Sequence, residues 1–400
     1  VLGVGYKSGL REDYAYDVTD ESDMILTGYL AFLDPPKPSA APAIQALLEH
    51  GVKTKILTGD NEKVTQAICE KVGLDVEHIL LGADIEQMTD QELAEVVEKV
   101  TVFAKLSPDQ KARIILQLKR NGHGVGYMGD GINDAPSMKV ADVGISVDTA
   151  VDIAKETADV ILLDKDLMVL ETGIVEGRKV YANMTKYIKM TVSSNFGNIF
   201  SLLVASIFLP FLPMAPVHLI VLNLVYDLSC VALPFDNVDQ DFLKQPHTWE
   251  AKSITRFMVW MGPISSIFDI LTFIFLYFII VPLVTGYHYV HGSESALQFI
   301  ILFQTGWFIE SMWSQTMVIH MLRTAKVPFV QSRPAWLVIF TTLVAAFFVT
   351  SLPYGPLVNI LRLAPLGLPY FLLLVGIIFL YMFSVTVIKK FYIKKYKEWL

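Results

Sequence analysis

Residues 121–136 read NGHGVGYMGDGINDAP, and this stretch decides between two kinds of phosphate-binding fold. Its glycines have the G-x-G-x-x-G spacing of a dinucleotide-binding loop. Its second half places Asp130 and Asp134 around a glycine and an asparagine, which supplies oxygen ligands of the kind that Mg²⁺ prefers. A dinucleotide loop needs its glycines in the turn after the strand, whereas Gly124 and Gly126 lie inside the apolar run GVGYM. We therefore favour a metal-holding loop.

Short apolar runs alternate with helical patterns around this loop, as a parallel α/β sheet requires. The runs predicted as strands cover residues 52–59, 100–106, 124–128, 142–147 and 159–164. Residues 61–73 and 107–122 are predicted as helices, the second with Ser107 as N-cap, Pro108 at the first helical position and Gly122 at its end. The first half of the chain is thus predicted to be a parallel sheet between helices.

Polar groups follow three of the predicted strands at the end where catalytic groups of such sheets gather. They comprise a hydroxyl, an ammonium, an amide and carboxylates, with one glycine: Thr58, Gly59, Asp60, Lys111, Asp130, Asn133 and Asp134. Donors for phosphate oxygens, a cation against their charge and carboxylates for Mg²⁺ together suit the binding of a phosphoryl group.

The second half of the chain is predicted to cross a membrane. The sequence is 53% hydrophobic, and the excess lies after about residue 185. Six segments have the roughly 20 apolar residues that a span needs. They cover about residues 190–213, 216–234, 258–284, 297–319, 335–354 and 367–388.

Positive charges predict which side of the membrane the soluble half occupies. Lys and Arg follow the second, fourth and sixth spans, whereas the opposite loops carry only Arg362. These residues are Lys244, Lys252, Arg256, Arg323, Lys326, Arg333, Lys389, Lys390, Lys394, Lys395 and Lys397. We expect the soluble half and the C-terminal tail to be cytoplasmic. The net charge of −8 without a basic stripe argues against nucleic acid as a partner.

Polar side chains inside the predicted spans are candidates for an ion site. Helical spacing places Asn195 and Asn198 on one face of the first span, and Asn223, Tyr226 and Asp227 on one face of the second. For the asparagines, hydrogen bonding between helices is an equally weighted alternative.

Two further acids lie within the third and fourth predicted spans. Glu310 is deep enough to join an ion site, while Asp269 has no polar partner nearby in sequence and is the weaker candidate. His218 and His320, near span ends, are expected at the membrane interface rather than as ligands.

The motifs TGDN (58–61), SPDQK (107–111) and GDGINDAP (129–136), followed by six spans, resemble the C-terminal half of a P-type cation-transporting ATPase. DPPK (34–37) is similar to the point at which that family re-enters its phosphorylation domain. The resemblance covers essentially the whole chain. It implies an α/β haloacid-dehalogenase-like phosphorylation domain followed by an all-α membrane domain of six transmembrane helices.

The resemblance also implies domain boundaries and site roles. Residues 1–30 would end the nucleotide-binding domain, 31–166 would form the C-terminal part of the phosphorylation domain, and 167–400 the stalk and membrane domain. A continuous helix is expected from about residue 167 to 207, roughly 60 Å at about 1.5 Å per residue. ATP would be the substrate. The roles carried over by motif are phosphate contacts from Thr58 and Lys111, the catalytic Mg²⁺ on Asp130, and support of that metal by Asn133 and Asp134.

One departure bears on the chemistry. The family phosphorylates an aspartate in D-K-T-G-T, which occurs nowhere in these residues. The chain is therefore expected to be a C-terminal portion that neither autophosphorylates nor pumps without the N-terminal part of its polypeptide.

The subclass follows from the membrane motifs. SSNFGN and NLVYD resemble the ion-binding helices of calcium pumps, but with Asn198 and Tyr226 where those have glutamate and threonine. Fewer carboxylates suit Mg²⁺ better than Ca²⁺, and VALPFDNVD resembles the bacterial magnesium-transporting subclass. We expect a multi-pass protein of the plasma (inner) membrane that moves Mg²⁺, by the resemblance inward. A calcium or manganese pump, a membrane-anchored phosphatase of the same soluble fold and a passive channel remain alternatives.

Overall fold

The computed structural model describes residues 2–8, 17–20, 22–30, 35–164, 166–293 and 295–399. Asp34 of the DPPK motif lies outside these residues. The chain divides into two compact units. The first comprises Val1–Glu49 and Lys53–Glu171, and the second comprises His50–Val52 and Thr172–Leu400.

The first unit is built from parallel strands and helices. An antiparallel hairpin, β1 (Leu2–Tyr6) with β2 (Ile25–Leu30), precedes them. One parallel sheet has the order β3-β5-β4, with bounds Ile56–Leu57, Val102–Ala104 and Ile79–Leu81. The other has the order β6-β7-β8, with bounds Gly126–Met128, Val143–Val147 and Val160–Leu162. The helices are α1 (Ala40–Glu49), α2 (Glu62–Lys71), α3 (Gly82–Gln87), α4 (Asp90–Lys99), α5 (Pro108–Arg120), α6 (Ala135–Val140) and α7 (Asp152–Thr157), with single 3-10 turns at Val18–Asp20 and Ile132–Asp134.

All five predicted strands are present and their pairings are parallel, but they form two sheets rather than one. The first sheet also contains β4, which the sequence reading missed. β3 and β6 each lie at the edge of a sheet. Leu57 of β3 and Val125, just before β6, pack against the same two hydrophobic clusters. The two sheet edges that precede the predicted phosphate-binding loops therefore share a core.

The helix that carries Lys111 begins where its sequence predicts. The Ser107 hydroxyl accepts a hydrogen bond from the Gln110 backbone N–H, and the Gln110 side chain accepts one from the Ser107 N–H at 3.0 Å. This capping box fixes the start of α5. Pro108 occupies the first turn, and Gly122 adopts a positive φ of 91° just after the helix.

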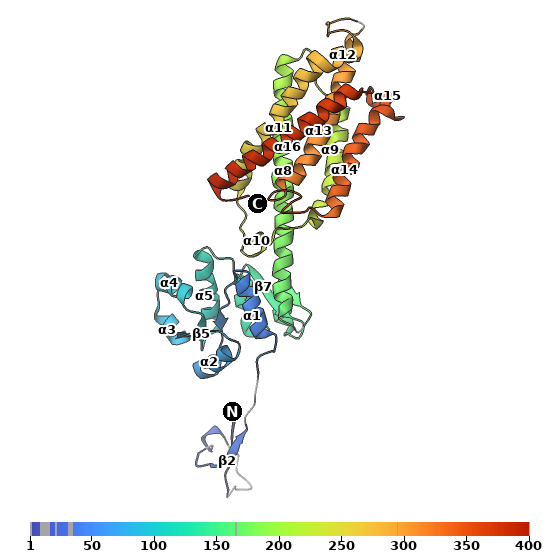
Figure 1. Cartoon of the computed structure of the whole chain (residues 1–400). Helices are drawn as coiled ribbons and strands as arrows, with labels where there is room; N and C mark the ends of the chain where they lie inside the picture. Colours follow the sequence, from blue (N-terminus) through green and yellow to red (C-terminus); the bar gives the residue numbers. More distant parts are fainter. Residues whose placement is uncertain are drawn as a thin grey trace. The chain divides into compact units, whose positions relative to one another are not determined.

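The second unit is a helical bundle. Its long helices are α8 (Met168–Phe208), α9 (Pro216–Cys230), α11 (Ala251–Phe275), α13 (Ala296–Leu322), α14 (Trp336–Ser351) and α16 (Leu368–Tyr396). Shorter segments are α10 (Gln240–Leu243), α12 (Val281–Thr285) and α15 (Val358–Leu361), 3-10 turns at Leu233–Phe235 and Leu352–Tyr354, and a π-helical turn at Leu276–Ile280. Figure 1 shows the long helices side by side. The continuous helix expected from about 167 to 207 is confirmed as α8.

Within the described residues, five helices are long and apolar enough to cross a membrane: Met168–Phe208, Pro216–Phe235, Ala251–Thr285, Trp336–Tyr354 and Leu368–Tyr396. The predicted fourth span, α13, is a helix of 27 residues but does not belong to this set. Its sequence contains Gln304, Glu310, Ser314 and Gln315, and most of its residues from 302 onward are buried. Polar side chains within a membrane span are tolerated where they face the interior of the helical bundle. The number of six spans therefore stays a prediction.

Candidate functional site

The loop after β3 folds back on itself beside the start of α5. The Thr58 hydroxyl donates to the Asp60 carboxylate and accepts from the Asp60 N–H, both at 3.1 Å. The Thr58 carbonyl accepts a hydrogen bond from Leu106 N–H at 3.0 Å, and the Asp60 carbonyl accepts one from Lys105 N–H at 2.8 Å. These bonds fix the loop against the segment that leads into α5. Gly59 lies between the two residues and is exposed.

Lys111 and Asp134 form an ion pair at the end of β6. The Lys111 ammonium lies 2.8 Å from Asp134 Oδ1, with the two side chains 11% and 15% exposed. The Tyr127 hydroxyl donates to the same oxygen at 2.7 Å, and the Gly131 N–H donates to Oδ2 at 3.3 Å. The structure therefore brings together two predicted site residues from α5 and the GDGIND loop. Tyr127 was not predicted, because inside an apolar run it reads as a core residue.

Gly129 is required by the closeness of the Asp134 side chain. A Cβ at position 129 would collide with Asp134 Cβ and lie 2.7 Å from its Cγ. The carbonyl of Gly129 accepts a hydrogen bond from the Ser146 hydroxyl at 3.0 Å. A Cβ at Gly124, by contrast, would meet no atom of the described residues within 4 Å. The glycine that matters sterically is thus the one that opens GDGINDAP, outside the apolar strand.

The local charges keep Asp134 ionised. Burial disfavours its charged form, but hydrogen bonds from Lys111 and Tyr127 and the charge of Lys111 outweigh burial and hold the pKa of Asp134 below its ordinary value. Burial and the facing carboxylate of Asp134 raise the pKa of Tyr127, so the phenol stays protonated and donates. These contacts fix three side chains relative to one another, and the loop folds around them: Lys111, Tyr127 and Asp134.

Asp130 and Asn133 are exposed, on the loop that folds around these three side chains. The Asp130 carbonyl accepts a hydrogen bond from Val151 N–H at 3.1 Å, which holds its backbone. Among the described residues, no group of three or more His, Cys, Asp or Glu side chains is arranged to hold a metal. Mg²⁺ is commonly held by one or two carboxylates together with phosphate and water oxygens. The loop therefore fits Mg²⁺ shared with a phosphoryl group and not a cage made of protein ligands alone.

The structure does not bring every predicted phosphate-site residue into contact. Within residues 35–164, no hydrogen bond joins Thr58 to Lys111, Asp130 or Asn133. The loop after β3 and the loop after β6 instead follow two separate sheet edges.

The predicted ion-site residues separate into two groups. Asn195, Asn223 and Asp227 are exposed on α8 and α9. Asn198 is half-buried, and Glu310 is only 1% exposed. The three residues predicted to share one face of α9 also differ in exposure, because Tyr226 is buried in the bundle while Asn223 and Asp227 are exposed.

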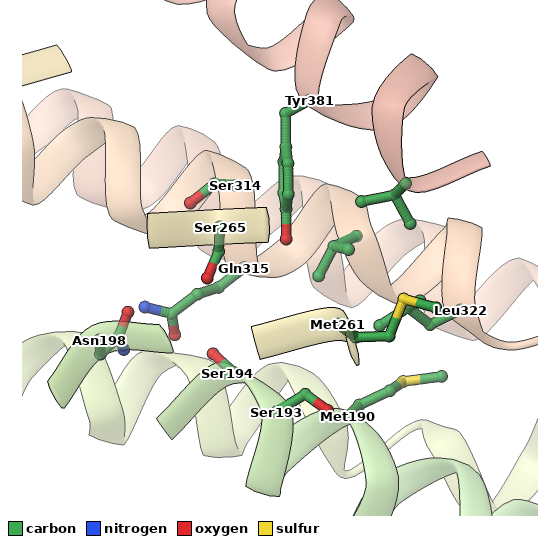
Figure 2. A pocket seen from close by; sticks show the side chains of 12 residues that line it. Met190, Ser193, Ser194, Asn198, Met261, Ser265, Ser314, Gln315, Leu322 and Tyr381 are labelled. Atoms are coloured by element: carbon green, nitrogen blue, oxygen red, sulfur yellow. The ribbon is translucent and has the colours of Figure 1, made fainter. Parts of the chain in front are cut away.

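Asn198 lines a small pocket with polar and apolar walls between α8, α11, α13 and α16. Figure 2 shows Asn198, Ser265, Gln315 and Tyr381 pointing into this space, which has a volume of about 20 Å³. That volume suffices for about one water-sized group. The exposed residues of α8 and α9 do not line it.

Asp269 is not isolated, contrary to the expectation from its sequence neighbours. The Trp307 indole N–H donates to Asp269 Oδ1 at 3.0 Å, and the Ser201 hydroxyl is hydrogen-bonded to Oδ2. These partners come from α13 and α8, far away in sequence.

The two histidines expected at the membrane interface are buried inside the bundle. His218 contacts the Leu361 carbonyl at 2.6 Å, and His320 contacts the Thr342 hydroxyl at 2.9 Å. Both positions face neighbouring helices, so they serve packing between helices.

Comparison with known protein families agrees with both units. Residues 7–142 match the family of haloacid dehalogenase-like hydrolases, and residues 211–391 match the C-terminal region of cation transporting ATPases. The chain belongs to the P-type cation-transporting ATPases. It combines a haloacid dehalogenase-like domain with a C-terminal membrane domain and is a multi-pass membrane protein.

Individual relatives show which transporters within this family the chain resembles more strongly. The chain is 52% identical over 396 residues to the magnesium-transporting ATPase, P-type 1, of Escherichia coli K12, and equally to that of Salmonella typhimurium LT2. The match covers 99% of this chain and 43% of each relative, so the chain spans less than half of their length. A calcium-transporting ATPase of Bacillus subtilis is 35% identical over 266 residues, 64% of this chain and 30% of the relative. The match to the magnesium transporters is thus longer and closer than that to the calcium pump.

Proposed function

We propose that this chain is the C-terminal part of an ATP-driven Mg²⁺ transporter that works through an aspartyl-phosphate intermediate. The observation that carries the proposal is the Lys111–Asp134 pair at 2.8 Å, in which Asp134 belongs to the same loop as the exposed Asp130. The loop thus holds a cation in place and also carries an exposed carboxylate, as phosphoryl transfer requires. The similarity to magnesium-transporting ATPases supports the choice of ion.

The residues of the first unit would divide the work of holding a phosphoryl group. Thr58 and the backbone at Gly59 would donate to its oxygens, and Lys111 would neutralise its charge. Asp60 closes the turn that presents Thr58. Asp134 would hold Lys111 in place, and Asn133 would orient the loop. Asp130 would bind Mg²⁺, which, when bound, neutralises charge on the phosphoryl group.

The strand that carries the nucleophilic aspartate would lie between the two sheets. β3 and β6 are both edge strands with parallel neighbours on one side only, and they share a core through Leu57 and Val125. In the full-length protein, a further parallel strand that ends in the D-K-T-G-T aspartate would pair with both edges. That strand would bring its aspartate to the loops after β3 and β6 and so complete the phosphate site.

The membrane unit would supply the transport path. We propose that α13 is a sixth span enclosed by the other five and that both the first unit and the C-terminus are cytoplasmic, in the plasma membrane. The domain boundaries would be those expected above, with residues 1–30, 31–166 and 167–400 as the three parts.

Earlier spans of the full-length protein would cover the exposed face of α8 and α9. Asn195, Asn223 and Asp227 would then complete an ion site with Asn198 and Glu310. Exposed amide and carboxylate oxygens on apolar helices are costly in lipid, which supports a polar partner for this face.

The test uses full-length protein in vesicles, with the ATP-binding side outward and a Mg²⁺-sensitive dye inside. External Mg²⁺-ATP is kept constant. Import into the cytoplasm corresponds to removal of Mg²⁺ from the vesicle interior, so internal Mg²⁺ should fall on addition of ATP. Asp130→Asn and Asp227→Asn should both stop the change, the first by blocking phosphoryl turnover and the second at the ion site. A flux of Ca²⁺ or Mn²⁺ without Mg²⁺ would favour the alternative pumps, and hydrolysis without any flux would favour a phosphatase.

A further inference from the structure

Two carboxylic acids face each other inside the helical bundle. Asp269 on α11 is 3% exposed, Glu310 on α13 is 1% exposed, and their carboxyl groups lie close enough to interact directly. Among the described residues, neither acid forms an ion pair with Lys, Arg or His. Two adjacent carboxylates do not both carry a charge in an environment of low dielectric constant. The pair therefore needs a positive species.

The hydrogen bonds around Asp269 accommodate a proton. The Ser201 hydroxyl contacts both Asp269 Oδ2 and, at 2.9 Å, the Gly197 carbonyl. A hydroxyl has a single proton, so it donates to one of these oxygens only. If it donates to Gly197, it accepts a proton from a protonated Asp269; if Asp269 is ionised, it turns and donates to the carboxylate. The Ser266 hydroxyl also donates to the Gly197 carbonyl at 2.9 Å, which therefore stays satisfied in both states.

The surroundings of Glu310 provide independent evidence that a positive species binds between the two acids. Both of its carboxyl oxygens are buried, and neither has a hydrogen-bond partner with ordinary geometry among the residues that the structure describes. A buried, unpartnered carboxylate is strongly disfavoured. The Tyr370 hydroxyl does not relieve it, because it donates to the Gly306 carbonyl at 2.7 Å. A proton between Asp269 and Glu310 would give Glu310 a hydrogen bond and remove the charge repulsion.

The pair adjoins the pocket of Figure 2, whose polar lining residues include Ser314, Gln315 and Tyr381. Tyr381 lies in the electrostatic field of both acids and also lines the pocket. Ser314 likewise lines it and neighbours Glu310. Gln315 extends into the same space, and its buried side-chain nitrogen has no partner within the described part of the chain. This pocket offers a polar route by which a proton can leave the pair toward α8.

The other titratable groups near these helices are occupied elsewhere. His218 of α9 packs against Phe308 of α13 with ring centres 5.2 Å apart and contacts a backbone carbonyl. His320 of α13 is bonded to Thr342 of α14. From α16, the Tyr381 phenol lies near both acids, and the Tyr370 phenol lies near Glu310. Among the described residues, none of these side chains forms an ion pair with Asp269 or Glu310, so none is a counter-ion for the pair.

We propose that Asp269 and Glu310 form a proton-binding site that holds one proton between their two carboxyl groups. With the proton between the two acids, the Ser201 hydroxyl donates to Asp269; with the proton on Asp269 Oδ2, Ser201 accepts it and donates to the Gly197 carbonyl instead. When the proton leaves through the pocket, the Ser201 hydroxyl donates to the ionised Asp269. The pair then carries one more negative charge, and the pocket becomes more attractive to a cation. The inference goes beyond the transported divalent ion and does not depend on its identity.

The experiment is infrared spectroscopy of the full-length protein in lipid nanodiscs at neutral pH, without ATP. A protonated carboxylic acid in the interior gives a carbonyl-stretch band apart from that of carboxylates, and the band shifts in D₂O. We expect this band in the wild type, a shifted band in Asp269→Asn and in Glu310→Gln, and its loss in the double variant. Asp152→Asn, at a side chain 94% exposed in the first unit, should leave it unchanged.

Two results would overturn the proposal. One is a wild type without the band, and the other is a double variant that retains it. If the double variant does not fold, Ser201→Ala takes its place, because loss of the hydrogen bond to Asp269 should shift the band, and an unshifted band would refute the site. The measurement involves no transport, so failure of the proposed pump would leave the result interpretable.

Discussion

Asp134 in the first unit and Asp269 in the helical bundle are both shielded aspartates, but their surroundings compensate the carboxyl group differently. Asp134 faces Lys111, with Tyr127 and a backbone N–H as further donors. Asp269 faces Trp307, Ser201 and a second acid. A cation keeps a carboxylate ionised, whereas a second acid requires a proton or a metal ion. Asp134 thus carries a fixed negative charge, whereas the charge of the proposed Asp269–Glu310 site changes when a proton binds or leaves.

A third aspartate shows that burial in the bundle alone does not decide whether a carboxyl group is ionised. Asp236 follows α9 and is fully buried, and its Oδ2 accepts from Lys186 at 2.7 Å and from Arg323 at 2.8 Å. Its Oδ1 accepts from the Ala335 N–H at 3.0 Å. Asp236 thus has the counter-charges that Asp269 does not have, and it ties α8, α13 and the start of α14 together.

The largest effect is expected for Asp236→Asn. The change leaves two buried cations without their anion, which typically costs about 3–5 kcal/mol. We expect the full-length protein to lose its folded membrane unit at a much lower temperature, measured by the fraction that stays monodisperse after heating. Asp241→Asn is the matched control, because its 2.8 Å pair with Lys326 is exposed and should contribute about 0–1 kcal/mol. Equal loss in both variants would contradict the comparison.

The next effect concerns the ionised pair of the first unit. Lys111→Ala removes the partner of Asp134 and the cation proposed to face the phosphoryl group. We expect phosphoenzyme formation from labelled ATP to slow roughly 100-fold, about 2.7 kcal/mol. Lys119→Ala on the same helix breaks another Lys–Asp pair of 2.8 Å, with Asp142, and should change the rate less than about twofold. Comparable losses would mean that the Lys111 effect is structural.

A smaller effect is expected for Gly129→Ala. The new methyl group would displace the Asp134 side chain from Lys111 and Tyr127. We expect about a tenfold loss of phosphoenzyme turnover, about 1.4 kcal/mol. Gly124→Ala introduces the same methyl group where no atom in the described part of the chain lies within 4 Å, so turnover should be retained. If Gly124→Ala were the damaging change, the dinucleotide interpretation of the glycines would return.

The pH dependence of Asp134 tests whether its charge is fixed. Because its folded-state pKa is lowered, its stabilising contribution is present above the unfolded-state pKa of about 3.9 and is lost as the pH falls through the lower folded value. We expect Asp134→Asn to lose about 1 kcal/mol of local protection at neutral pH, and this difference to shrink in acid. Hydrogen exchange of the segment 126–134, compared between the two proteins at each pH, measures it. A difference that grew toward acid would show that the charge of Asp134 is destabilising.

Part of this structure could be predicted from the sequence. Features encoded by neighbouring residues were predictable, such as the capped start of α5 at Ser107 and the length of α8. β4 was missed because its three apolar residues, Ile79–Leu81, stand alone between His78 and Gly82, whereas the equally short β3 and β5 lie within the longer predicted segments 52–59 and 100–106. The hydropathy of α13 is lower than that of the other long helices because it contains Gln304, Glu310 and Gln315, and its enclosure by other helices is a property of packing that hydropathy does not encode.

Contacts between distant segments could not be predicted. Ser201 and Trp307 lie 68 and 38 positions away from Asp269. Their approach depends on helix packing, which spacing along one helix does not encode. Helical spacing likewise placed Asn223 and Asp227 together, but it could not indicate that this face of α9 is exposed in the present chain.

The smallest effect is expected for Asp269→Asn. If Asp269 shares a proton with Glu310, an amide replaces a group of the same shape and the same low charge, so the free energy of unfolding should change by less than about 1 kcal/mol. An ionised Asp269 would behave otherwise, because the Trp307 and Ser201 hydrogen bonds would then stabilise a charge that the variant lacks. The heating assay used for Asp236→Asn applies here without change. A loss as large as that of Asp236→Asn would mean that Asp269 carries a fixed charge, and the distinction between the two regions would fail.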